Sequence, residues 1–304
     1  MDEQIKKQNA IQKAKNAAIN AIDENGNGKI DIEDIIVKGL KTPGIKINRA
    51  EFLRKTLQKR FPQETIELAI AESPMRANVA QTEIDKMAND AINFERVCAS
   101  GISAALSAPG GFAGIAAIPV DLTQYYAYLL RMTQKLLYLY GFPQIDTEET
   151  GEKFDDGTMN TLILCFGVMY GVAGANKALL TVARALGAGL SKKFMQTAVT
   201  KGTIYPVLKA ILKCFNVKLT KQLASKAINH SLPVIGGVIG GGITFFSFKS
   251  CGEKLKKTLR DTYLSNPDYQ PPFEDKVQKD ASCDSVKTPK KNKTLGVVAD
   301  QTRF

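Results

Sequence analysis

The stretch VCASGISAALSAPGGFAGIAAIPV, from Val97 to Val120, decides the fold because it holds 24 residues without a charge. A helix of about 20 apolar residues is long enough to cross a bilayer. Pro109-Gly110-Gly111 lies near the middle, however, where proline lacks a backbone N–H and glycine favours a turn. The sequence therefore predicts two short apolar helices folded into a hairpin, either buried in a helical body or dipped into a bilayer, with small residues allowing close packing.

Two further uncharged runs follow the hairpin, at residues 157–176 and 232–248. The second contains glycines at i, i+4 spacing, a pattern typical of closely packed helices, in the pairs Gly236/Gly240 and Gly237/Gly241. The runs predict an all-α fold: a multi-helix bundle with apolar, Gly/Ala-rich helical hairpins.

Polar helices are expected on both sides of the hairpin. One is predicted to run from Thr82 to Arg96, and a long amphipathic one from Asp121 until Gly141 ends it. Its apolar face is formed by Leu122, Tyr125, Tyr126, Leu129, Thr133, Leu136, Leu137 and Tyr140. Asp121 is interpreted as a cap that complements the helix dipole, rather than as a catalytic acid.

An EF-hand-like helix-loop-helix is expected to precede the bundle. The segment DENGNGKIDIED, from Asp23 to Asp34, places oxygen ligands at the spacing of a calcium loop, with Gly28 at the sharp turn and Ile30 as apolar anchor. The expected ligands are the Lys29 carbonyl and the side chains of Asp23, Asn25, Asn27, Asp31 and Asp34. The last loop position holds Asp34 where a bidentate Glu is usual, so we expect weakened Ca²⁺ binding and competition from Mg²⁺.

EF-hands normally pair, and the sequence contains no second loop. The candidate starting at Asp146 fails because Lys153 replaces the apolar anchor and Gly157 occupies the last position. Two possibilities follow for the solitary loop: Ile30 docks on its own chain, or the loop pairs with a second copy in a homodimer.

The net charge of +11 comes from one segment. No Asp or Glu occurs from Gly157 to Gly252, which carries eleven of the 41 Lys and Arg residues, and the rest of the chain is balanced. The counter-charge must come from elsewhere in the fold or from an anionic partner, such as acidic lipid headgroups. Nucleic acid is disfavoured as a partner because the lysines lie within apolar small-residue helices, without a recognition motif.

Three regions are predicted: the EF-hand-like unit in 1–43, an all-helical domain in 44–265 and a disordered basic tail in 266–304. The chain opens with the polar MDEQIKK and no apolar segment of a secretory signal, so a cytoplasmic protein is expected. The five scattered cysteines have no zinc-binding spacing and are expected to be reduced thiols.

The PGGF…IPVDLTQYYAYLLRMTQKLLYLYGF run and the later LPVIGGVIGGGITFFSF run together resemble the two signature regions of the EcsC protein family. The resemblance covers about residues 80–260 and leaves the EF-hand-like loop outside. It implies a bacterial, all-helical protein that is membrane-associated or cytoplasmic, and it supplies no catalytic residues to carry over.

The favoured function is that of a non-enzymatic, calcium-binding protein associated peripherally with the inner membrane leaflet or with a membrane protein complex. The first alternative is a hydrolase of lipid or phosphate substrates, although no G-x-S-x-G, His/Asp cluster or metal dyad is visible. The second alternative is an integral membrane protein, although Pro or Gly clusters interrupt each uncharged run.

Overall fold

The computed structural model describes residues 22–24, 26–108, 111–145, 156–188, 204–215 and 235–266, with scattered positions between 9 and 20. Every element in these ranges is a helix, which confirms the predicted all-α fold. The helices are α2 (Ile32–Lys41), α3 (Arg49–Leu57), α4 (Gln63–Ala71), α5 (Gln81–Ser107), α6 (Gly111–Leu139), α7 (Asp156–Tyr170), α8 (Ala175–Gly187), a helix over 204–215, and α11 (Ile235–Arg260).

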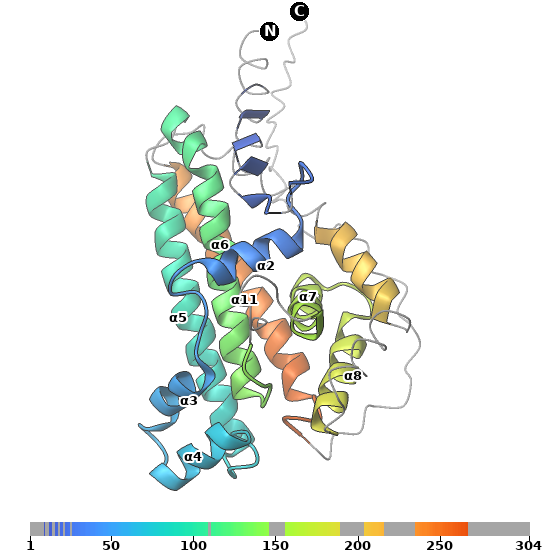
Figure 1. The fold of residues 1–304 in the computed structure, drawn as a ribbon. Helices are drawn as coiled ribbons and strands as arrows, with labels where there is room; N and C mark the ends of the chain where they lie inside the picture. Colours follow the sequence, from blue (N-terminus) through green and yellow to red (C-terminus); the bar gives the residue numbers. More distant parts are fainter. Residues whose placement is uncertain are drawn as a thin grey trace, which may run out of the picture.

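Three long helices, α5, α6 and α11, lie side by side along one flank of the fold (Figure 1). A Cβ built on Gly241 of α11 would lie 3.0 Å from the Ala104 Cβ of α5, and one on Gly252 would lie 2.9 Å from Ile92. Residue numbers therefore rise along α11 as they fall along α5, so these helices are antiparallel. The contact at Gly241 confirms one predicted glycine contact, while the surroundings of residues 235–240 lie outside the description.

The stretch from Val97 to Val120 forms the predicted helical hairpin, but its two helices are not short. α5 continues past Arg96 to Ser107, and α6 begins at Gly111, ahead of Asp121. The predicted boundaries at Arg96 and Asp121 are wrong, because at these residues the sequence changes its polarity and not its ability to form a helix. α6 even passes through Pro119, a residue type that usually ends or kinks a helix.

The interior is filled by α7 and by the predicted apolar face of α6. α7 lies between α11 and α8 (Figure 1), and its residues 162–166 are at most 2% exposed. The Tyr126 ring of α6 lies 6.4 Å from that of Phe166 and 5.4 Å from that of Phe215. The uncharged run that starts at residue 157 is therefore protein core in its described helix.

A buried arginine joins α3 and α4 to the end of α6. Arg49 begins α3, and its guanidinium is surrounded by backbone carbonyls, which explains how a charged side chain that is 9% exposed is accommodated. Burial lowers the pKa of Arg49 from its ordinary value. The guanidinium donates hydrogen bonds of 2.6–3.3 Å to the carbonyl oxygens of Ala69, Ile70, Glu72 and Phe142.

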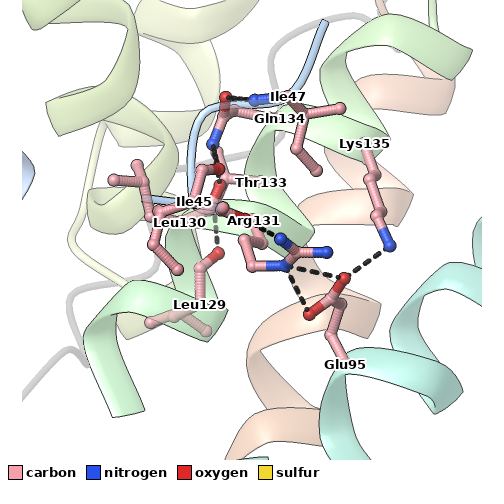
Figure 2. Close-up of polar contacts among 10 residues, drawn as sticks. Ile45, Ile47, Glu95, Leu129, Leu130, Arg131, Thr133, Gln134 and Lys135 are labelled. Atoms are coloured by element: carbon pink, nitrogen blue, oxygen red, sulfur yellow. Dashed lines mark hydrogen bonds and ion pairs between the residues drawn. The ribbon is translucent and has the colours of Figure 1, made fainter. Parts of the chain in front are cut away.

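The segment between α2 and α3 is fastened to α6 by Gln134. The Gln134 amide accepts from the N–H of Ile47 and donates to the carbonyl of Ile45, both at 3.0 Å (Figure 2). α2 packs on α6 and α7, and its Ile32 and Ile36 belong to the same buried core. The division into 1–43, 44–265 and 266–304 stays a prediction, and the tail beyond residue 266 lies outside the described residues.

No helix in the part of the chain that the structure describes is long and apolar enough to cross a membrane. The part of the EF-hand-like unit that precedes the loop is described only at scattered positions, and residues 189–203 and 216–234 of the segment without Asp or Glu lie outside the description.

Candidate functional site

The EF-hand-like loop turns tightly around the carboxylate of Asp23. This carboxylate accepts backbone hydrogen bonds from Gly26 at 2.7 Å, Asn27 at 3.2 Å and Gly28 at 2.7 Å. Gly28 has a φ of +76°, a conformation that glycine adopts without strain. The backbone is thus wrapped around the first predicted ligand, with the predicted glycine at the turn.

Two further predicted ligands of the loop contact each other. The Asn27 side chain donates from Nδ2 to Asp31 Oδ2 at 3.3 Å and accepts the Lys29 N–H at 2.9 Å. The loop therefore brings side chains from its fifth and ninth positions into contact. Asn25, the predicted ligand at the third position, lies outside the described residues.

Asp34 closes the loop by accepting backbone hydrogen bonds from its second and ninth positions. Its Oδ1 accepts the N–H of Glu24 at 3.2 Å, and its Oδ2 accepts that of Asp31 at 3.1 Å. Asp31 in turn accepts the N–H of Asp34 at 3.0 Å, which completes a capping box at the start of α2. The carboxylate at the twelfth position is 2% exposed, so it lies in the interior of the loop.

Ile30 and Glu24 fasten the loop to the rest of the chain. Ile30 is 6% exposed and belongs to the hydrophobic core of a single chain, as in the first of the two predicted arrangements. Glu24 forms ion pairs of 3.0 Å with Lys38 and Lys41 of α2. Homodimerisation through the loop stays a prediction.

The acidic groups around the start of α2 influence one another. Burial raises the pKa of Asp34, and the charge of Asp31 raises it further. Burial likewise raises the pKa of Glu33, with added repulsion from Asp31 and Asp34. Hydrogen bonds from Lys38 and Lys41 lower the pKa of Glu24. A nearby cation favours the charged form of a carboxyl, whereas burial and like charges disfavour it.

The donor set of the loop fits a hard divalent cation, since it offers carboxylate, amide and backbone carbonyl oxygens. Among the described residues, however, no three Asp, Glu, His or Cys side chains come together as a metal-binding group. Amide and carbonyl oxygens, with Asn25 among them, would have to complete the coordination of a bound ion.

A second candidate site is the apolar arm, which we define as residues 97–107 of α5, 111–120 of α6 and 235–246 of α11. None of these segments contains a charged residue. The paired ends of α5 and α6 extend beyond the level of α2 in Figure 1. Each helix presents a large apolar side chain to solvent: Val97 is 59% exposed, Val120 58% and Phe246 73%.

The interior of the arm is polar where its three helices meet. The hydroxyl of Ser103 on α5 donates to Asp121 Oδ1 on α6 at 2.5 Å, and the hydroxyl of Thr244 on α11 donates to Ser103 at 3.2 Å. The prediction that Asp121 caps a helix start is wrong, because the residue lies ten positions inside α6 and is 1% exposed. Sequence reasoning missed Ser103 and Thr244, although serines at i, i+4 in an uncharged helix could have indicated a polar seam.

The carboxylate-free segment is the stretch from Gly157 to Gly252, which contains no Asp or Glu. Its described cations are exposed and form no ion pair with a described carboxylate. They comprise Lys177, Arg184, Lys209, Lys213 and Lys249. The Lys209 ammonium lies 4.7 Å from the centre of the Tyr205 ring, and that ring is itself 47% exposed. Among the described residues, no carboxylate from elsewhere in the fold therefore supplies the expected counter-charge to these five cations.

Comparison with known proteins found no matching family model, curated protein or solved structure.

Proposed function

We propose that the chain is a non-enzymatic, calcium-binding protein that associates peripherally with an anionic membrane surface. The observation that carries this proposal is the apolar arm, whose three uncharged helical segments expose Val97, Val120 and Phe246. Exposed apolar surface gathered at one place marks interaction sites in proteins. The resemblance to the EcsC family supports a bacterial protein at the cytoplasmic face of the membrane.

The energetics favour reversible association. Fully burying a Val or Phe side chain stabilises by about 1.5–3 kcal/mol, so the three exposed side chains together supply a few kcal/mol. Each Lys or Arg near an anionic surface adds about 1 kcal/mol. The exposed cations of the carboxylate-free segment, which form no ion pair with a described carboxylate, can therefore strengthen the association, and salt should weaken it.

In this proposal the loop from Asp23 to Asp34 holds Ca²⁺, with Mg²⁺ as a competitor. The Lys29 carbonyl and the side chains of the five other predicted ligands would bind the ion. The hydrogen bonds of Asp23 and Asp34 to the loop backbone support calcium binding, because they wrap the backbone around the first and last carboxylates of the loop. Since α2 packs on α6, a bound ion would stabilise the helix that lies next to the arm-bearing helices.

Flotation with liposomes tests the membrane proposal. The purified protein is mixed with neutral or anionic vesicles, with Ca²⁺ or chelator, at low and high salt. The matched variants are Val97→Asp with Phe246→Asp in the arm, and Leu68→Asp on α4, where the side chain is also exposed, at 40%. α4 lies at the opposite end of α5 from the arm (Figure 1).

We expect salt-sensitive flotation with anionic vesicles only, its loss in the arm double variant and its retention in Leu68→Asp. A dependence on Ca²⁺ would make the loop a switch, and independence would make it a stabiliser. Absence of flotation with every vesicle, or equal loss in arm and α4 variants, would refute membrane association through the arm.

A further inference from the structure

A basic pocket of about 630 Å³ lies between α3, the first half of α5 and the C-terminal third of α6. Its cationic lining consists of Lys46, Lys55, Lys59, Arg60, Arg131 and Lys135. The acidic side chains in the lining are Glu51 and Asp90, so the lining carries a formal excess of four positive charges, of which Glu95 and Glu83 next to the pocket neutralise two. Such an excess in a concave site attracts anions.

The floor of the pocket is fixed by a buried acid. Glu95 is 0% exposed and pairs with Lys135 at 2.5 Å and with the Arg131 Nε at 3.2 Å (Figure 2). Arg131 also donates from Nη1 to the carbonyl of Gly44. One carboxylate thus holds two cations in place and neutralises only one of their charges, which leaves a preorganised positive group at the floor.

The rim of the pocket supplies further charge. Lys46, Lys55 and Lys59 are exposed, and none of them forms an ion pair with a carboxylate in the described ranges. Arg60, by contrast, is paired with Glu83 at 3.0 Å and Asp90 at 3.3 Å. The three rim lysines can therefore move onto a ligand without breaking an existing ion pair.

Aromatic side chains line the same pocket. The Lys135 ammonium lies 4.9 Å from the centre of the Phe94 ring and 5.9 Å from that of Phe52. Phe94 is 58% exposed, so its ring can cover an apolar part of a ligand next to the charged part. The lining therefore suits an anion that is attached to an apolar body.

We propose that this pocket binds the phosphate group of a phosphate monoester. Such a group carries about −1.5 to −2 charges at neutral pH and has several acceptor oxygens, which matches a cluster of lysine and arginine donors. Phe94 also begins the exposed face of α5 that continues through Val97, Gly101 and Ala105 to Ala108, so the pocket lies at the foot of the apolar arm.

The dimensions suit a lipid as the source of the phosphate. From Phe94 to Ala108 the helix rises by about 20 Å. One leaflet of a bilayer has a hydrocarbon layer of about 15 Å, with headgroups outside it. With the arm inserted along the membrane normal, the pocket would lie at headgroup level. This lipid form of the ligand rests on the proposed membrane association, whereas phosphate binding by the pocket does not.

The test uses the full chain and two variants with equal loss of charge. The pocket variant combines Lys46→Gln, Lys55→Gln and Lys59→Gln. The control combines Lys13→Gln, Lys254→Gln and Lys257→Gln, at exposed lysines outside the pocket and without ion pairs among the described residues. Glycerol 1-phosphate is titrated by calorimetry. Vesicles with phosphatidic acid, a monoester, are compared with vesicles of equal surface charge made with phosphatidylglycerol, a diester.

We expect the pocket variant to lose at least about tenfold in affinity for a monoester probe and the control less than about twofold. Binding of glycerol 1-phosphate supports a phosphate site whose ligand is soluble. Preference for phosphatidic acid vesicles, without binding of glycerol 1-phosphate, supports a phosphate site whose ligand is a lipid. Failure of the wild type to bind either probe, or equal losses in both variants, overturns the proposal. If no vesicle floats the protein, the calorimetric titration still decides phosphate binding independently of membrane association.

Discussion

Ser103 and Asp121 form a hydrogen bond of 2.5 Å between α5 and α6, inside a part of the molecule that is otherwise built from uncharged residues. Thr244 extends the contact to α11. Because these groups are at most 4% exposed, the arm is polar at its seam and apolar outside, the reverse of an ordinary soluble bundle. The buried polar contact thus joins the three helices from within, while Val97, Val120 and Phe246 face solvent.

Replacing Ser103 with Ala should destabilise the fold by about 1–3 kcal/mol, because the buried Asp121 carboxylate loses a donor that water cannot replace. Urea unfolding followed by circular dichroism measures the change. Ser250→Ala at an exposed position of α11 is the control and should stay within about 0.5 kcal/mol. Equal small effects at both serines would show that the seam contributes no stability.

Neighbouring glycines of α11 should respond in opposite directions to alanine. At Gly241 a Cβ would lie 3.0 Å from the Ala104 Cβ and 3.2 Å from the Ser100 carbonyl oxygen, so Gly241→Ala forces α5 and α11 apart and destabilises. At Gly242 a Cβ meets nothing within 4 Å, and Gly242→Ala should stabilise by up to about 1 kcal/mol through helix propensity. Thermal unfolding of both variants checks this, and a stabilised Gly241→Ala would contradict the close packing.

These examples show what the sequence could and could not reveal. The end of α5 at Ser107 and the start of α6 at Gly111, the Gly241 contact and the buried face of α6 follow from local patterns that the structure confirms. The buried position of Asp121 does not follow from a local pattern, because a lone acid beside an uncharged run resembles a helix cap until its partner on another helix is known. Glu95 is similar: its burial depends on Arg131 and Lys135, which reach it from a different helix. Polar contacts between distant segments leave no periodic signal.

Removing the carboxylates at the first and last positions of the loop should abolish stabilisation by calcium. In wild-type protein a Ca²⁺ concentration of 100 times Kd adds about 2.7 kcal/mol, which corresponds to several degrees in Tm. The double variant Asp23→Ala/Asp34→Ala should melt at the same temperature with Ca²⁺ or with chelator, as measured by scanning calorimetry. Glu24→Gln is the matched control, since Glu24 lies in the loop but pairs with Lys38 and Lys41. An unchanged Ca²⁺ response in the double variant would exclude the site.

Arg49→Met should be strongly destabilising, by about 3 kcal/mol or more, because the guanidinium hydrogen-bonds to four backbone carbonyls where α3, α4 and the end of α6 meet. Arg54→Met is the control on the same helix, where the exposed side chain pairs with the exposed Glu67. Urea unfolding should separate the two variants clearly. A loss below about 1 kcal/mol for Arg49→Met would show that the buried arginine is dispensable.

Membrane association through the apolar arm is tested most directly by measuring the depth of the arm in a bilayer. The chain contains no tryptophan, so Ala105→Trp on the exposed face of α5 introduces a single fluorescent reporter, and Leu68→Trp on α4 provides the control. With anionic vesicles, we expect a blue shift for Ala105→Trp and quenching by lipids with brominated acyl chains, and neither effect for Leu68→Trp. Unchanged emission of Ala105→Trp, with vesicles present in excess, would contradict insertion of the arm.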